Sequence, residues 1–325
     1  MTRIVTVGAA QLGPIALNDT RAQVVNRMID LMQQAKSNGC DVVVFPELAL
    51  TTFFPRWYFE KQDELDAFFE RAMPGPDTQR LFDTAKTLQI GFYLGYAELV
   101  NEGGQLRRFN TAITVDKAGT IISKYRKIHL PGHKEHEPWR RFQHLEKRYF
   151  ETGNLGFTAF QADWGKDKQG VFGMAVCNDR RWPETYRILG LQAVEMIFIG
   201  YNTPVHNPPA PEHDALSNFH NELVMQAGAY QNGTWVVGVA KAGTEEGVEQ
   251  IGNSIIVAPS GEIVGACTTL GDELAIARCD LDLCNSYKNT TFNFARHREP
   301  EQYRMIVERK GAVPPEALPS GSKQA

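Results

Sequence analysis

Apolar runs of strand length alternate with segments of helical periodicity along most of the 325-residue chain. The residues at 41–45 form a run rich in β-branched side chains, the pattern of a strand buried on both faces. Apolar residues recur at helical spacing over 24–35, 81–88, 183–191 and 214–231. Strands are predicted at 4–10, 41–45, 91–99, 108–115, 121–128, 171–176, 194–199 and 278–281. The alternation predicts an α/β fold.

An internal similarity indicates how these elements are organised. Residues 92–97 match 235–240, and 110–113 match 253–256 in the same register. The turn at 118–121 corresponds to 260–263 with one residue deleted. Chance similarity is the alternative explanation. The match predicts two related α-β-β halves, whose sheets pack face to face with helices outside.

The chain carries no linker-like segment, so we expect a single domain over 1–308. Prolines and glycines after Arg309 predict a flexible tail over 309–325. Two long segments inside the domain, the aromatic-rich 48–76 and the polar 132–153, are predicted to be functional loops.

Composition excludes several classes of partner. A net charge of −4 and a pI near 6.1 give no reason to expect binding to nucleic acid or to an anionic membrane. The N-terminus has no signal-peptide core and no apolar run approaches a membrane span, so we expect a cytoplasmic enzyme. The five cysteines form no C-x-x-C pair and no H-E-x-x-H motif occurs, so no metal site is predicted.

Three chemically competent residues follow predicted strands. Cys177 ends the run at 171–176, Glu47 follows the run at 41–45, and Lys127 lies at the end of a third strand. Ligands gather at the carboxyl ends of strands in α/β sheets. A thiol there could act as a nucleophile, a carboxylate as its base and an ammonium as the oxyanion donor. The alternatives are a buried structural thiol, a capping or ion-paired acid and a solvated lysine.

Other polar residues invite two interpretations each. Arg180 and Arg181 follow the cysteine, where consecutive guanidiniums could hold a carboxylate; the alternative is a surface pair. His129, His144 and His220 lie in the polar loop or near the helix at 214–231, where histidines are more often solvated than catalytic.

Longer blocks of sequence resemble one known family. Phe45-Pro46-Glu47, Lys124-Tyr125-Arg126-Lys127 and Cys177-Asn178-Asp179-Arg180 look like the three blocks of the nitrilase superfamily. The resemblance is closer to the N-carbamoyl-D-amino-acid amidohydrolases and extends from about Thr2 to Glu308. It is carried by the stretches at 47–57, 127–135, 142–148, 178–184 and 200–204.

This resemblance implies a fold and a reaction. The fold is a four-layer α-β-β-α sandwich of two mixed sheets, assembled into a homo-oligomer such as a dimer or tetramer. The reaction is hydrolysis of an N-carbamoyl-D-amino acid to the D-amino acid, ammonia and carbon dioxide, without a cofactor. The implied roles are nucleophile for Cys177, base and acid for Glu47, oxyanion donor for Lys127, second acid for Glu146, carboxylate grip for Arg180 and Arg181, and pocket support for Asn202, His129, His144 and His220.

Two alternatives stay open beside that implication. Another amidase of the superfamily, or a β-ureidopropionase, would share the three catalytic residues. The arginine pair is the distinguishing feature, because an uncharged amide has no carboxylate for it to bind. A catalytically silent binding protein on the same fold is the second alternative, against which an intact Glu47, Lys127 and Cys177 argue.

Overall fold

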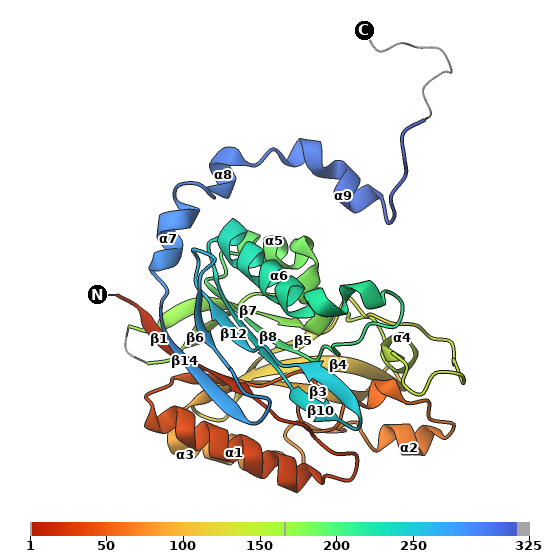
Figure 1. Cartoon of the computed structure of the whole chain (residues 1–325). Helices are drawn as coiled ribbons and strands as arrows, with labels where there is room; N and C mark the ends of the chain where they lie inside the picture. Colours follow the sequence, from red (N-terminus) through yellow and green to blue (C-terminus); the bar gives the residue numbers. More distant parts are fainter. Residues whose placement is uncertain (1, 166, 317–325) are drawn as a thin grey trace.

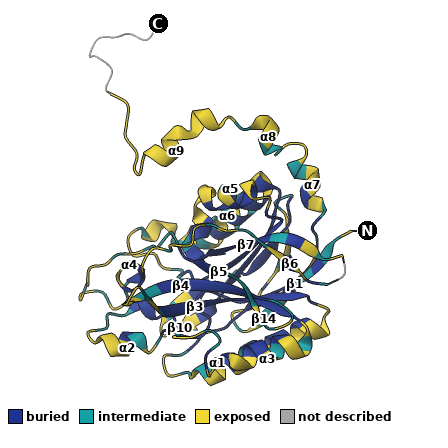
Figure 2. Ribbon diagram, turned by 180° about the vertical axis from the view of Figure 1, so that it is seen from behind, coloured by how far each residue is buried: buried dark blue, intermediate teal, exposed yellow. Residues whose placement is uncertain are grey.

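Two six-stranded sheets pack face to face in the computed structural model of the chain, which describes residues 2–165 and 167–316 (Figure 1). Helices lie on the outer side of each sheet. Buried residues concentrate on the strands, and exposed ones on the helices and loops (Figure 2). The α-β-β-α sandwich expected from the sequence is confirmed.

The first sheet has the strand order β14-β1-β2-β3-β4-β5. β2 runs parallel to β1 and β3, whereas β14, β4 and β5 are antiparallel to their neighbours, so the sheet is mixed. Its strands are β1 (Ile4–Gln11), β2 (Val42–Val44), β3 (Gly91–Glu102), β4 (Gln105–Val115), β5 (Ile121–Arg126) and β14 (Glu273–Asp280).

The second sheet has the order β13-β12-β9-β8-β7-β6. Its three central strands β7, β8 and β9 are parallel, and the outer strands are antiparallel. The strands are β6 (Phe160–Asp163), β7 (Gln169–Val176), β8 (Met196–Tyr201), β9 (Trp235–Ala240), β12 (Ile255–Val257) and β13 (Ile263–Ala266).

The helices that cover the sheets agree with the predicted segments. α1 (Arg21–Ser37) starts at a capping box between Thr20 and Gln23 and packs with α3 (Gln79–Leu88) on the first sheet. α5 (Pro183–Leu191) and α6 (Ser217–Asn232) cover the second sheet. The predicted start of α6 at 214 is wrong, because 211–216 form a separate 3₁₀ helix. Shorter helices are α2 (Gln62–Asp66), α4 (Glu146–Tyr149), α7 (Leu283–Lys288), α8 (Phe294–His297) and α9 (Arg304–Glu308).

The central strand β2 is buried on both faces, as its composition predicts. Val42 and Val44 belong to the core between the two sheets, while Val43 belongs to the core beneath α1 and α3. A polar contact also joins the sheets: the Tyr93 hydroxyl of β3 donates to the Ala175 carbonyl at 3.0 Å and accepts from Gly200 N at 3.1 Å. This contact lies near the strand ends that carry the candidate residues, and so it fixes one sheet relative to the other there.

The internal similarity corresponds to equivalent structure. Gly95 of β3 pairs with Ala112 of β4, and its counterpart Gly238 of β9 pairs with Ile255 of β12. Both pairs of strands are antiparallel and each follows a helix, α3 in one half and α6 in the other. The predicted α-β-β halves and their common register are therefore confirmed.

Two segments lie outside the sandwich. A two-stranded hairpin, β10 (Ala242–Glu245) and β11 (Val248–Ile251), interrupts the path from β9 to β12. Helices α7 to α9 lead away from the second sheet, with α9 apart from the main body (Figure 1).

Residues 309–316 form no helix or strand, and positions 317–325 of the predicted tail lie outside the described residues. Within the described part of the chain, no helix is long and apolar enough to cross a membrane.

Candidate active site

The nucleophile candidate occupies a sharp corner. β7 ends at Val176, and Cys177 opens a 3₁₀ helix, Cys177–Arg181, with a φ of 50°. A non-glycine residue in this left-handed region is strained and persists only where its surroundings hold it. Asp179 provides such support, because its Oδ2 accepts the Val176 N–H at 3.0 Å. The corner presents a thiol that is 5% exposed.

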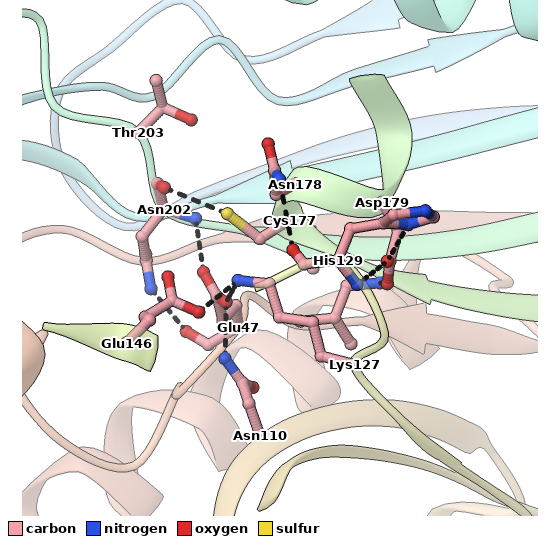
Figure 3. A network of polar contacts seen from close by, with 12 residues as sticks. Glu47, Asn110, Lys127, His129, Glu146, Cys177, Asn178, Asp179, Asn202 and Thr203 are labelled. Carbon is pink, nitrogen blue, oxygen red and sulfur yellow. Dashed lines mark hydrogen bonds and ion pairs between the residues drawn. The ribbon is translucent and has the colours of Figure 1, made fainter. Parts of the chain in front are cut away.

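The base candidate lies opposite, on the first sheet. Glu47 follows β2 and is fully buried. Its Oε1 accepts hydrogen bonds from Lys127 Nζ and from Asn110 Nδ2, both at 2.7 Å, and its Oε2 accepts from Asn202 N at 3.1 Å. Three donors from three different elements therefore fix this carboxylate (Figure 3).

Lys127 links two carboxylates. It follows β5, is fully buried, and donates to Glu47 at 2.7 Å and to Glu146 Oε2 at 2.6 Å. Glu146 is the first residue of α4, and its other oxygen lies 3.1 Å from His144 Nε2. The second acid implied by the family resemblance is thus in direct contact with the lysine.

The reactive atoms form one compact cluster. The sulfur of Cys177 and carboxylate oxygens of Glu47 and Glu146 lie within 4.8 Å of one another. Such a trio could ligate a metal ion, but Lys127 Nζ already contacts both carboxylates and supplies a positive charge between them. The prediction that three strand ends meet is confirmed in its geometry.

Burial and neighbouring charges set the protonation states. Burial, followed by the negative charge of Glu47, raises the pKa of the Cys177 thiol to about 12. Burial also raises the pKa of Glu47, although Lys127 opposes it. For Lys127 and Glu146, burial favours the neutral forms, but opposite charges outweigh it, so the pKa of Lys127 is raised and that of Glu146 is lowered. The cluster therefore holds a protonated thiol beside an ammonium and two acids.

Asn202 connects the thiol with its base. Its carbonyl oxygen accepts a hydrogen bond from Cys177 Sγ at 3.3 Å, and its side-chain Nδ2 donates to the Glu47 carbonyl at 2.8 Å. Together with the bond from its N–H to the Glu47 carboxylate, these contacts set the distance between the two residues. Asn202 is 4% exposed, and its predicted support of the substrate pocket stays a prediction.

The two consecutive arginines have different surroundings. Arg180 is buried, and its Nε, Nη1 and Nη2 donate to Asn221 Oδ1, the Cys177 carbonyl and Thr203 Oγ1 at 2.7–2.9 Å. Arg181 is exposed and makes no side-chain hydrogen bond among the described residues. The neighbouring charge of Arg180 is the main cause that lowers the pKa of Arg181 to about 10. Arg180 thus fixes the loop after the nucleophile, while Arg181 is an uncompensated cation beside it.

The three histidines occupy different places. His129 contacts Asp179 through Nδ1 at 2.8 Å and stacks on Trp182 with ring centroids 5.2 Å apart. His144 contacts Glu146, as described above. His220 lies on α6, where its ring contacts His213 and Phe219. Its predicted pocket role stays a prediction, because no contact joins it to the cluster within the described residues.

A cavity of about 1090 Å³ is bordered by the chain neighbours of the reacting residues. Ile128 and His129, which follow Lys127, lie in its wall together with Asn178, which follows Cys177. Its basic lining residues outnumber the acidic Glu60 and Glu151; they are Lys61, Arg107, Arg108, Lys134, Lys147, Arg148 and Lys310. This side of the site therefore favours an anionic molecule.

Sequence reasoning missed two supporting residues. Asn110 donates to the Glu47 carboxylate from β4, and it stands in the segment that repeats between the two halves. Asp179 accepts from Val176 N, Tyr125 Oη and His129 N, and it stands two positions after the nucleophile. Asn110 lies in the repeated segment and Asp179 in the block that begins at Cys177, but Glu47, Tyr125 and His129 come from elements distant in sequence.

Comparison with known proteins identifies the family. The profile of the carbon-nitrogen hydrolase family matches residues 6–289. The chain belongs to this family. The resemblance seen in the sequence is therefore confirmed at the level of the nitrilase superfamily. Hydrolases of this superfamily act on carbon–nitrogen amide bonds.

Relatives of this carbon-nitrogen hydrolase give the identity more detail. The N-carbamoylputrescine amidase of Solanum lycopersicum is 30% identical over 324 residues, covering 96% of this chain and 98% of that protein. A carbon-nitrogen hydrolase structure from Helicobacter pylori superposes with a TM-score of 0.79 at 22% identity, covering 95% of this chain and 99% of that one. An amidase from Nesterenkonia sp. AN1 has a TM-score of 0.68 at 17% identity, covering 93% and 96%. The Solanum relative supports the amidase class, the two structures support the fold, and the substrate stays open.

Proposed function

We propose that this carbon-nitrogen hydrolase cleaves N-carbamoyl-D-amino acids to the D-amino acid, ammonia and carbon dioxide. The observation that carries the proposal is the buried Cys177–Glu47–Lys127–Glu146 cluster next to the uncompensated cation of Arg181. The cluster supports attack on an amide-type carbonyl, and the cation supports a carboxylate on the substrate. The D configuration rests on the long blocks of resemblance to the N-carbamoyl-D-amino-acid amidohydrolases.

The cluster can perform the reaction in two stages. Glu47 takes the proton of Cys177, and the sulfur attacks the ureido carbonyl carbon to form a tetrahedral oxyanion, which Lys127 stabilises. The carbon–nitrogen bond then breaks, and the leaving nitrogen receives the proton from Glu47. Water, deprotonated by Glu47, then attacks the thiol-bound carbonyl. The carbon–sulfur bond breaks, Glu47 returns the proton to the sulfur, and the released carbamate loses carbon dioxide to give the second nitrogen product. Each removal of one donor from an oxyanion of this kind costs about 10²–10³ in rate in other enzymes.

A solved relative supports the role of the cysteine. In a variant of the Nesterenkonia amidase, the acetamide moiety of fluoroacetamide is covalently attached to the active-site cysteine. Cys177 occupies the corner after β7 in the matching fold, where it faces the two carboxylates. We therefore assign the covalent step to Cys177.

Charge distinguishes the proposed substrate from that of the plant relatives. The Solanum protein is named for N-carbamoylputrescine, whose free end is an amine that is protonated at neutral pH. Here a guanidinium whose pKa is lowered by another guanidinium follows the nucleophile, and the charged residues that line the adjoining cavity are mostly lysines and arginines. A carboxylate would relieve this excess positive charge, whereas an ammonium would increase it. The arrangement therefore favours the amino-acid substrate.

Among the arginines, we assign the carboxylate contact to Arg181. Arg180 already donates from all three nitrogens to protein acceptors, so recruiting it would break buried hydrogen bonds. Arg181 is exposed, so it can form a bidentate pair without that cost.

Ammonia release from a panel of defined substrates tests the proposal. The panel contains the D and L forms of N-carbamoylphenylalanine, N-carbamoylputrescine, N-carbamoyl-β-alanine and propionamide. We expect the highest kcat/KM for the D-amino-acid derivative. A higher value for N-carbamoylputrescine would refute the charge argument, and a higher value for the β-alanine derivative would identify a β-ureidopropionase. Preference for propionamide would identify a simple amidase.

A further inference from the structure

A second buried group of charges lies apart from the reacting cluster. Lys241 and Glu245 are fully buried, and Arg56 is 3% exposed. Lys241 Nζ lies 2.9 Å from Glu245 Oε2, and Arg56 Nη2 lies 3.0 Å from Glu245 Oε1. Taking charges out of water is costly, and this group holds two cations against a single carboxylate, so its burial is weak evidence for a role in stability alone.

Glu245 uses its remaining capacity on main-chain N–H groups. Oε1 accepts from Phe53 N at 2.7 Å and Oε2 from Ile15 N at 3.1 Å, while its carbonyl accepts from Arg56 Nη1 at 2.5 Å. Lys241 Nζ donates to the Thr51 carbonyl at 2.8 Å. The charged group therefore binds the segment that follows Glu47 at several points.

The same group is connected to the other loops of the active site. The segment at 55–56 accepts hydrogen bonds from Leu145 N and Gln143 N at 2.8 and 2.9 Å, directly before Glu146. On the hairpin, Ile251 N donates to the Thr203 carbonyl at 3.0 Å, directly after Asn202. The loops that carry Glu47, Glu146 and Asn202 thus meet around one buried charge cluster.

The internal repeat shows that this arrangement is a departure from symmetry. The constant offset between the halves makes β10 and β11 the counterparts of the outer parts of β3 and β4, which stay in the first sheet. Gly243 of β10 and Gly252, directly after β11, have φ values of 78° and 57°, at positions where the first half has Val100 and Phe109. These glycines allow the strands to leave the sheet and turn toward the loops.

We infer that Lys241 and Glu245 are positioning residues, which hold the loops of Glu47, Glu146 and Asn202 at the separations that the thiol chemistry needs. They act through those loops and touch no reacting atom. The inference requires the Cys177–Glu47 chemistry alone and is independent of the substrate assigned under the proposed function. A displacement of about 1 Å caused by a remote substitution can cost about 10²-fold in rate.

Alkylation of Cys177 by iodoacetamide tests the inference without a substrate. The full-length protein is treated with the reagent, and the modified cysteine is quantified by mass spectrometry. Lys241→Met leaves the neutral pair of Arg56 and Glu245 and removes the bond to Thr51, so we expect a folded protein with an alkylation rate at least tenfold lower. Lys241→Arg restores a donor and should return the rate to within threefold of the parent. On the preferred substrate, kcat should fall with the alkylation rate while KM changes less than threefold.

Glu195→Gln provides the matched control. Glu195 is also a buried acid paired with an arginine, Arg3 at 2.6 Å, but it lies before β8, at the end of that strand away from the active site. This variant should lose stability and keep the parent alkylation rate. An unchanged rate in Lys241→Met would overturn the inference, and so would an equal loss in Glu195→Gln, because both would reduce the cluster to general stability.

Discussion

Lys127 is expected to serve both stability and catalysis, and a pair of variants separates the two. Lys127→Met leaves Glu47 and Glu146 as two buried carboxylates without the cation that now lies between them. Lys127→Met combined with Glu146→Gln also removes the negative charge of Glu146, so Glu47 no longer faces a second carboxylate. The difference in stability between the two variants therefore measures the repulsion between the carboxylates.

The magnitude follows from the geometry. Oxygens of the two carboxylates approach within 4.8 Å. At an effective dielectric constant of about 20, two charges at that distance repel by about 3.5 kcal/mol. This repulsion raises the pKa of one carboxyl in folded Lys127→Met above its unfolded value. Stability is then greatest below the pKa of an exposed glutamate, near 4.3, and is lost as the pH rises through the raised folded-state pKa.

Urea unfolding followed by tryptophan fluorescence at pH 5 and pH 8 provides the assay. The double variant should exceed the single variant in unfolding free energy by an amount that grows with pH toward about 3.5 kcal/mol. A difference that is constant with pH, or a single variant that is the more stable at pH 8, would refute the reasoning. Both variants should lose at least about 10² in kcat, since the oxyanion donor is absent from each. Recovery of turnover in the double variant would show that Lys127 acts only on stability.

Substitutions at three further positions test individual residues of the site. Cys177→Ala should abolish ammonia release without changing the thermal midpoint of unfolding. Cys267→Ala, which removes another buried thiol, is the control and should retain turnover. Activity in Cys177→Ala would exclude the covalent mechanism. Arg181→Ala should raise KM for N-carbamoyl amino acids about tenfold and leave propionamide unaffected, and Arg181→Lys should recover part of the loss; equal effects on both substrates would remove the carboxylate contact. Asn110→Ala removes a hydrogen-bond donor to the Glu47 carboxylate and so should raise the pKa of Glu47. The acidic limb of the pH profile of kcat/KM should then move to higher pH. An acidic limb at the parent pH would contradict the assignment of Glu47 as the base.

The reacting residues could be predicted because each follows a strand whose composition is readable in the sequence. The apolar run before Cys177 and the β-branched run before Glu47 both form interior strands, one in each sheet. Both residues therefore follow the C-terminal end of a strand, where functional residues of α/β sheets gather. Lys127 follows β5, which is an edge strand, and its full burial could not be read from the strand pattern. The polar segment at 132–153 supplies that burial by folding α4 against it, and a loop without periodicity gives no signal of such a contact.

The supporting residues could not be predicted because most of their partners lie on elements distant in sequence. In the sequence Asn110 is a strand residue of the repeated segment, and only the strand order, in which β3 alone separates β4 from β2, brings it to Glu47. The different surroundings of Arg180 and Arg181 could not be predicted for a similar reason. The two are adjacent in sequence, but the 3₁₀ helix turns one into the protein and the other to solvent. Where the backbone is not a regular helix or strand, the position of a residue in the sequence says little about the direction in which its side chain points.

The charge balance of the site explains why a thiol with a raised pKa suits this chemistry. Glu47, Glu146, Lys127 and Arg180 bring two negative and two positive charges together, and Arg180 Nη1 lies 4.0 Å from Cys177 Sγ. A thiolate at rest would add a buried charge without compensation, so the proton stays on sulfur. Transfer of that proton to Glu47 moves the negative charge without changing the total, and attack moves it again to an oxygen near Lys127. Because burial raises the pKa of both the thiol and its acceptor, the first transfer is less uphill than it would be to an exposed glutamate. The nucleophile is therefore generated at the moment of attack, and its reactivity depends on the distances that Asn202 and the hairpin maintain.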